Sequence, residues 1–309
     1  MAQTRGVKHR FFRAIPYGLL INMLERAEVF LRKKAKVYGI FVILRPEFCK
    51  SIVRNSMKIV IAFDSFKGSL SAEEACSIVR ETITAIMPEA EIVSLPIADG
   101  GEGTTTAICR GIETKAIEVT VHDPLLREIT ASYAITSDGK TAIMEMASAA
   151  GLTLLAEGER NVMQTTTVGV GEMMQDAIER GCKKIIIGIG GSATNDCGLG
   201  LLSVFGLSIY DDKNNKLQPF GGEMHKAKKA IWQGGLPKDL LKGIELIIAS
   251  DVDNNLYGED GAAYVYARQK GCTPKDIETL DNGLRNIADL LAEYAENKQF
   301  HLQKGAGAA

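Results

Sequence analysis

Apolar positions along the chain follow two alternating periods. Short apolar or β-branched runs of strand length alternate with segments in which apolar residues recur every three or four positions, the spacing of one helix face. The clearest helix follows Thr273, because Pro274 suits the first helical position and an apolar stripe continues to Tyr294. Strands are predicted at 58–63, 92–96, 117–121, 129–135, 141–146, 184–188 and 244–249, and further helices after Ser71 and at 171–180.

This alternation of strands and helices predicts an α/β fold built on a largely parallel sheet. Ser71 and Glu74 have the spacing of a capping box, which places a helix start directly after the first loop. Asp138-Gly139, between two β-rich runs, indicates a hairpin.

One local arrangement occurs four times: a strand, then a loop rich in Gly, Ser, Asp and Asn, then a helix. The loops span 64–71, 99–104, 188–196 and 250–254. In open α/β sheets such loops lie beyond the carboxyl ends of the strands, where ligands bind. Glycines allow the backbone to approach a phosphate, and helix N-terminal N–H groups point at it. Lys67 is the candidate cation, and the candidate Mg²⁺ ligands or bases are Asp64, Asp99, Glu102, Asp196, Asp251 and Asp253.

Each pattern also has an interpretation without chemistry. The 64–69 segment could be only a turn followed by a helix cap. The Asp251-x-Asp253 pair could be an Asx-turn with exposed carboxylates. Asp211 and Asp212 fit the tip of a hairpin better than a site.

A rival function comes from Gly188-x-Gly190-x-x-Ala193, which matches the dinucleotide-binding fingerprint after a strand. Asp211 and Asp212 follow about 20 residues later, where a ribose-binding acid belongs. An NAD-linked oxidoreductase is therefore one alternative. Against it, the residues after the fingerprint make the helix entry unusually polar, and the fingerprint leaves the first two loops unexplained.

Charge divides the chain at about residue 56. The first 56 residues hold 12 Lys and Arg against 3 Asp and Glu, and the remainder holds 24 against 35, so the net charge of −2 averages two unlike parts. The total gives no support to nucleic-acid binding. The basic leader has two short apolar stretches, and neither approaches the roughly 20 residues that span a bilayer. It could be a membrane-surface arm or a transit peptide, but we expect a tail or translated sequence upstream of a start at Met57.

Six cysteines are scattered through the chain without a C-x-x-C pair or metal-ligand spacing to one of the four histidines. A zinc site is therefore not expected. Single cysteines in an α/β chain without an export signal indicate a reducing, cytoplasmic location. His122, His225 and His301 have no obvious partner in the sequence and are interpreted as surface or structurally satisfied residues. Nothing in the sequence indicates an oligomeric state.

Taken together, the polar motifs resemble the bacterial type-1 glycerate kinase family. The matching segments are K-I-V-I-A-x-D-S-F-K-G-S from Lys58, P-I-A-D-G-G-E-G-T from Pro96, G-I-G-G-S-A-T-N-D from Gly188 and D-V-D-N from Asp251. T-T-T-x-G-x-G-E from Thr165 and Q-K-G from Gln269 fit as well. Several polar motifs in the right order are far harder to match by chance than one fingerprint, and the similarity runs from Met57 to the end.

The resemblance implies ATP- and Mg²⁺-dependent phosphorylation of D-glycerate to 2- or 3-phosphoglycerate. On this basis the loops at 64–71 and 188–196 are expected to bind anionic phosphate or carboxylate. The predicted catalytic residues are Asp64, Lys67, Asp99, Asp196 and Asp251, and the predicted metal ligands are Asp251 and Asp253. Predicted cofactor contacts come from Ser65, Lys67, Gly68, Ser69, Gly100, Gly101, Glu102, Gly103, Gly190, Gly191, Ser192 and Asn195.

The resemblance also implies two α/β domains, one of them flavodoxin- or Rossmann-like, with the site between them. The expected division is a leader at 1–56, the first part of the flavodoxin-like domain at 57–115, the second domain at 116–300 and a truncated connection at 301–309. In the family, the G-A-G-A-A segment continues into further strands, helices and a T-G-E-G-R-x-D motif. The first domain is therefore expected to be incomplete, and an inactive ligand-binding fragment of a glycerate kinase is the second alternative.

Overall fold

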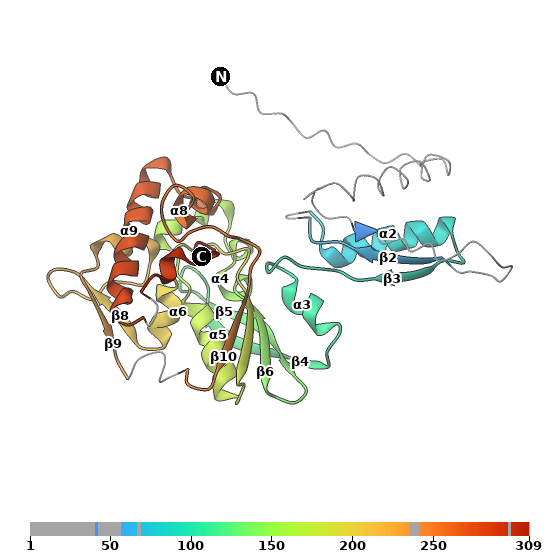
Figure 1. The fold of residues 1–309 in the computed structure, drawn as a ribbon, viewed down its shortest axis with the longest axis horizontal. Helices are drawn as coiled ribbons and strands as arrows, with labels where there is room; N and C mark the ends of the chain where they lie inside the picture. The colour runs from blue at the N-terminus through green and yellow to red at the C-terminus, as the bar shows by residue number, and fades with distance from the viewer. Residues whose placement is uncertain (1–40, 43–56, 67–68, 235–240, 296–297, 309) are drawn as a thin grey trace, which may run out of the picture. The chain divides into compact units, whose positions relative to one another are not determined.

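The computed structural model describes residues 41–42, 57–66, 69–234, 241–295 and 298–308. All of these lie in one compact unit, Phe41–Ala309. The described strands form a three-stranded, a five-stranded and a two-stranded sheet with helices packed against them (Figure 1). The α/β fold class predicted from the sequence is confirmed.

The central sheet has five strands. In spatial order they are β10 (Glu245–Ala249), β7 (Lys184–Gly188), β6 (Thr141–Glu145), β5 (Glu128–Thr136) and β4 (Thr114–His122). β10, β7 and β6 are parallel, whereas β6, β5 and β4 pair antiparallel. The prediction of a largely parallel sheet is therefore wrong for its β4–β6 side, because the short connections there cannot make a parallel crossover. Gly139, at φ +71°, turns the hairpin that Asp138-Gly139 predicts.

One face of the central sheet packs against α5 (Val168–Glu179). Met173 and Met174 of this helix are fully buried and share a core with Met144 on β6 and Ile185 and Ile187 on β7. The methionines therefore serve as core packing. Two shorter helices, α3 (Thr104–Cys109) and α4 (Ala147–Ala150), contact β6.

A second core surrounds α9 (Pro274–Ala292), the helix that the Thr273-Pro274 start predicts. Its apolar stripe shares this core with the antiparallel pair β8 (Leu207–Tyr210) and β9 (Lys229–Trp232), with α6 (Leu199–Val204) and with α8 (Ala262–Tyr266). Tyr294 lies just past the helix. The centroid of its ring is 6.4 Å from that of Trp232 in an edge-on arrangement, and its hydroxyl donates to the carbonyl of Ala230.

A third, smaller core holds β2 (Lys58–Ala62) to α2 (Ala72–Ile86). β3 (Glu91–Ser94) runs parallel to β2 on one side, and β1 (Phe41–Val42) pairs antiparallel on the other. The capping box at the start of α2 is confirmed, because Ser71 Oγ accepts from the Glu74 amide and the Glu74 carboxylate accepts from the Ser71 amide. Apart from Phe41–Val42, the predicted leader lies outside the described residues.

Short 3₁₀ turns complete the described chain. They are η1 (Leu152–Leu154), η2 (Glu157–Glu159), η3 (Val162–Gln164), η4 (Gly221–Lys226), η5 (Ala267–Lys270) and η6 (Phe300–Leu302). The boundary predicted between 115 and 116 falls within β4, and the division into two domains stays a prediction. Among the described helices, none is long and apolar enough to cross a membrane.

Candidate functional site

Three of the four predicted loops meet at the carboxyl ends of their strands. The amide of Gly190 donates a 3.0 Å hydrogen bond to the carbonyl of Gly100, which joins the loop after β7 to the loop after β3. The amide of Ile189 donates to the carbonyl of Ala249 at 3.3 Å, which joins the same loop to the end of β10. Residues about 60 to 150 positions apart in the sequence therefore form one backbone cluster, in which the loop after β3 of the three-stranded sheet meets the carboxyl ends of β7 and β10 of the five-stranded sheet. Ligands of α/β proteins bind beyond such strand ends.

Glycine is required where these loops touch. A Cβ on Gly100 would lie 2.6 Å from the carbonyl oxygen of Ala249, and Gly100 has φ +97°. A Cβ on Gly190 would lie 2.7 Å from the Cα of Gly101, and one on Gly188 would lie 2.5 Å from the carbonyl oxygen of Gly100. Any side chain at these positions would push the loops apart, so the glycine-rich composition follows from backbone contact.

The loop at 99–104 closes around its own carboxylate. Asp99 is half-buried, and its Oδ1 accepts a 3.0 Å bond from the Gly101 amide. Gly103, at φ +92°, leads into α3, where the Thr104 hydroxyl donates to the carbonyl of Gly101 at 2.7 Å. Glu102 is exposed. Asp99 and Glu102 therefore differ in setting: one is fixed within the loop, and the other faces solvent.

The loop at 188–196 turns from exposed to buried along its length. Gly191 is exposed and left-handed, at φ +73°. Ser192 is 5 % exposed, and Asn195 and Asp196 are fully buried. The side-chain amide of Asn195 has no hydrogen-bond partner within the described residues. The first half of this loop can therefore meet a ligand directly, whereas the second half lies beneath it.

Asp196 binds hydrogen-bond donors from three directions. Its Oδ2 accepts from the amide and hydroxyl of Thr167, each at 2.8 Å, and from the Gly200 amide at 3.1 Å. Its Oδ1 accepts from the Gly198 amide at 3.1 Å. Burial raises the pKa of this carboxyl, and the donors oppose that shift. The carboxylate thereby ties the starts of α5 and α6 to the end of the loop.

Lys270 is a buried cation that contacts this loop. It ends η5, is 3 % exposed, and donates to Ser192 Oγ at 2.8 Å and to the carbonyl of Thr194 at 2.6 Å. Burial lowers its pKa to about 7, while the nearby charge of Asp196 opposes that shift. The Q-K-G motif that contains Lys270 does not reveal this role, because a lysine 78 positions from its partner carries no local signal.

The loop at 250–254 presents two exposed carboxylates. Within the described residues, neither Asp251 nor Asp253 accepts a local backbone N–H, so the structure does not support the Asx-turn interpretation. Asp253 Oδ2 lies 3.3 Å from Lys304 Nζ, and Asn254 binds the hydroxyl of Tyr266 and the amide of Gly307. The loop is therefore fixed by its asparagine, and its aspartates stay accessible.

The first loop forms a tight turn. The amide of Phe66 donates to the carbonyl of Leu70 at 2.8 Å, and the Leu70 amide donates back at 3.1 Å. Asp64 is half-buried and its Oδ1 accepts from the Ser65 amide at 2.6 Å, while Ser69 is exposed. Lys67 and Gly68 lie outside the described residues. This geometry fits both the phosphate-binding and the turn-plus-cap interpretations.

The described residues hold no complete set of metal ligands. Within the described residues, no group of three or more His, Cys, Asp and Glu side chains could hold an ion by itself. Mg²⁺ commonly binds one or two carboxylates and completes its shell with water and substrate phosphates. Exposed Asp251 and Asp253 fit this shared kind of site.

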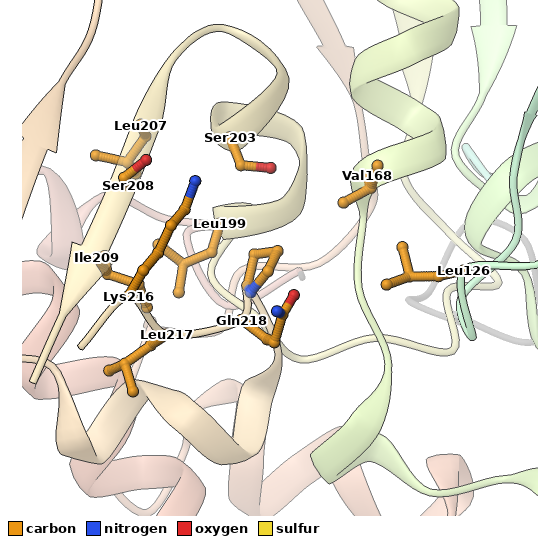
Figure 2. Close-up of a pocket in the computed structure, with 11 residues that line it drawn as sticks. Leu126, Val168, Leu199, Ser203, Leu207, Ser208, Ile209, Lys216, Leu217 and Gln218 are labelled. Carbon is orange, nitrogen blue, oxygen red and sulfur yellow. The ribbon is translucent and has the colours of Figure 1, made fainter.

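A hollow of about 400 Å³ has none of the predicted site residues in its lining (Figure 2). Its lining includes the buried apolar side chains Leu199 of α6 and Leu207 and Ile209 of β8, together with polar residues such as Ser203 and Lys216. Leu126 faces the hollow from the β4–β5 connection, at φ +62°. The predicted site residues therefore lie outside the lining of this cavity.

The structure does not support the dinucleotide-binding alternative. In that motif a helix begins within the glycine pattern. Here α6 begins only at Leu199, after an irregular stretch that includes left-handed Cys197, at φ +55°. Asp211 lies in a tight turn, where its carboxylate accepts from the amides of Lys213 and Asn215. The hairpin-tip interpretation of Asp211-Asp212 is confirmed.

Two further contacts have no local signal in the sequence. Glu145, at the end of β6, is 8 % exposed and accepts a 2.6 Å bond from the Thr105 amide at the start of α3. His122 does have a partner, because its Nδ1 lies 2.8 Å from Glu172 Oε1. Glu172 belongs to the quoted T-T-T-x-G-x-G-E segment, but a contact across 50 positions leaves no local pattern.

Comparison with known proteins gives a consistent result. A family model described as the glycerate kinase family matches residues 59–309. The chain is 41 % identical over 253 residues to a Glycerate kinase of Bacillus subtilis (strain 168), and 40 % identical over 257 residues to a Glycerate 2-kinase of Escherichia coli (strain K12). These alignments cover 82 % of this chain in each case, and 65 % and 66 % of the respective relatives. The chain thus spans about two thirds of the length of these curated relatives.

A solved structure is also similar. The crystal structure of a candidate glycerate kinase 2 from Salmonella typhimurium LT2 superposes with a TM-score of 0.69 at 38 % sequence identity. The match covers 82 % of this chain and 67 % of that chain. The similarity in sequence and in fold therefore extends over the same share of the molecule.

Proposed function

This chain belongs to the glycerate kinase family, and from that premise we propose that its loop cluster carries out ATP-dependent phosphorylation of D-glycerate. The observation that carries the proposal is the junction of three polar loops through Gly100, Gly190 and Ala249. Backbone amides and carboxylates gathered at the carboxyl ends of these strands suit a reaction that depends mainly on positioning and charge neutralisation.

The glycines of the second and third loops are proposed to bind the anionic groups. Gly190, Gly191, Gly101 and Gly103 offer backbone that can approach a phosphate or carboxylate closely, as glycine-rich loops do. Ser192 and Asn195 belong to the 188–196 loop, and we propose that the buried Asn195 supports the shape of this loop. Ser65, Lys67, Gly68 and Ser69 remain the proposed phosphate contacts of the first loop, together with Gly100 and Glu102 of the second.

Four aspartates have distinct proposed tasks. Asp99 is the proposed base, because its half-buried carboxylate is fixed at the junction of the loops. Asp64 would orient the first loop through the Ser65 amide. Asp251 is also proposed as a catalytic carboxylate, because it is exposed just after the end of β10. Asp196 is reassigned from direct chemistry to holding the loop, because it is fully buried and saturated with donors.

The transfer itself follows from these positions. The hydroxyl oxygen of glycerate attacks the γ-phosphorus of ATP, the bond to the bridging oxygen of ADP breaks, and the hydroxyl proton passes to Asp99. Asp251 and Asp253 would hold Mg²⁺, which when bound neutralises the phosphate charge. The product would be 2-phosphoglycerate or 3-phosphoglycerate, in a cytoplasmic setting, with D-glycerate as the small-molecule partner.

A coupled assay tests this proposal. The purified chain with ATP, Mg²⁺ and D-glycerate should form ADP at a rate that rises with D-glycerate. Binding of D-glycerate without turnover, measured calorimetrically, would favour the ligand-binding fragment instead. A folded chain that shows neither turnover nor binding of D-glycerate would overturn the proposed function.

A further inference from the structure

Lys270 is placed where a lysine is costly. Its side chain is buried, and an ammonium group removed from water loses solvation that only well-placed acceptors restore. The two acceptors described above, Ser192 Oγ and the carbonyl of Thr194, belong to the loop after β7. A hydrophobic side chain of similar volume would fill the same space without this cost. The lysine therefore points to a requirement other than packing.

The segment that Lys270 binds has an irregular backbone. No helix or strand spans residues 189–198, and its shape depends on separate contacts. On one side, the amide of Ala193 donates to the carbonyl of Ala150, and the Thr165 hydroxyl donates to the carbonyl of Ala193. Lys270 binds the residues before and after Ala193, from another element of the chain.

The position of Lys270 is itself fixed. It ends η5 just before Gly271, whose backbone is left-handed at φ +86°. A Cβ on Gly271 would clash with the carbonyl oxygen of Arg160. Ala267, at the start of the same turn, is fully buried, and its carbonyl accepts from the amide of Cys272. The turn therefore presents the lysine to the loop from a rigid base.

We propose that Lys270 is a positioning residue that sets the shape of the loop at 188–196, so that Gly190 and Gly191 present their backbone to an anionic substrate. This inference rests on the proposed function for its kinetic consequence only. Lys270 does not touch the substrate in this account. Its loss should weaken binding of the anionic group and leave the chemical groups of the site in place.

The test compares three variants with the wild-type chain. Lys270→Met removes the ammonium, and Ser192→Ala removes one acceptor and leaves the lysine. Lys184→Met is the matched control, because Lys184 begins the same strand, β7, and pairs with Glu245 at the opposite end from the loop. Hydrogen–deuterium exchange of the 188–196 segment and steady-state kinetics with ATP and D-glycerate are measured for each.

We expect exchange of the 188–196 segment to become about tenfold faster in Lys270→Met, with the exchange of β7 unchanged. KM for one anionic substrate should rise about tenfold while kcat changes less than KM. Lys184→Met should match the wild-type chain in both readouts. Wild-type exchange and wild-type kinetics in Lys270→Met would overturn the inference.

The two proposals fail in distinguishable ways. If the wild-type chain shows no glycerate-dependent turnover, the proposed function fails, and the exchange measurement still decides the role of Lys270. If Lys270→Met does not fold, Ser192→Ala decides: faster exchange in the 188–196 segment supports the inference, and wild-type exchange overturns it.

Discussion

The amide of Gly190 lies 3.0 Å from the carbonyl oxygen of Gly100, and this single hydrogen bond joins loops that follow two different strands. The contact is possible because neither residue has a side chain. It places Gly190 of one loop beside the loop that carries Asp99. The relationship links a sequence feature, two glycine-rich stretches, to a site that neither stretch forms alone.

Replacing Gly190 should separate the two loops. In Gly190→Ala the new Cβ would lie 2.7 Å from the Cα of Gly101, so backbone must shift. We expect a loss of about 1–3 kcal/mol in unfolding free energy, and a fall in kcat/KM for D-glycerate of about tenfold or more. Gly111→Ala is the control, because nothing lies within 4 Å of its Cβ position. Equal behaviour of the two variants would contradict the contact.

Asp196 should prove to be a stabilising residue. Asp196→Asn keeps the shape but sets an NH₂ group against donors from Thr167, Gly198 or Gly200. We expect urea unfolding to show a loss of about 3 kcal/mol. The exposed Asp212→Asn, two elements away in the turn after β8, should change stability by less than about 0.5 kcal/mol. A wild-type unfolding curve for Asp196→Asn would refute this role.

The pKa of Lys270 predicts how stability depends on pH. Its pKa is lowered from 10.5 to about 7 in the folded chain, so between these values the unfolded chain binds the additional proton. The free energy of unfolding contributed by this group is therefore highest above pH 10.5 and decreases as pH falls from 10.5 to about 7. The slope in this range is at most about 1.4 kcal/mol per pH unit. Groups other than Lys270 titrate in both proteins and cancel in a comparison with Lys270→Met.

The measurement is the unfolding free energy of both proteins at pH 7 and pH 9. The stability of the wild-type chain relative to Lys270→Met should increase from the lower to the higher pH. A difference that stays constant, or that decreases, would mean that Lys270 keeps its proton in the folded chain across this range.

The carboxylates after β10 should govern the requirement for Mg²⁺. Asp251→Asn removes one proposed ligand, so the Mg²⁺ concentration for half-maximal activity should rise about tenfold. Asp253→Asn should act in the same direction and also release Lys304. Asp260→Asn, an exposed neighbour on the same segment, serves as the control. An unchanged Mg²⁺ dependence in both ligand variants would remove them from the proposed metal site.

Much of the fold could be predicted because the signals are local. The strand at Lys184–Gly188 and the helix after Thr273 follow from apolar periodicity and a cap, and both are confirmed. The direction of the strands was harder to predict from the sequence. The sequence of the β4–β6 region is β-rich, which predicts strands but not their direction. The antiparallel pairing follows from the short connections between these strands.

The sequence predicted which loops form the candidate site, but not the contacts between those loops. Glycine and aspartate mark where loops lie, so loops at the carboxyl ends of these strands could be expected, but the contact of Gly100 with Gly190 joins strands of two different sheets and leaves no local signal. The inward turn that buries Asn195 and Asp196 could not be expected, because Ala, Thr, Asn and Asp give the same loop signal whether they face solvent or core. Lys270 was missed for the same reason: burial of a lysine is set by tertiary packing, which periodicity does not record.

The central claim is that this loop cluster transfers a phosphoryl group to D-glycerate. The most direct measurement is ³¹P NMR of the purified chain with ATP and Mg²⁺, recorded with and without D-glycerate. The account predicts a new phosphomonoester resonance, together with ADP, only when D-glycerate is present, and its loss in Asp99→Asn. An unchanged ATP spectrum in the presence of D-glycerate and a folded chain would contradict it.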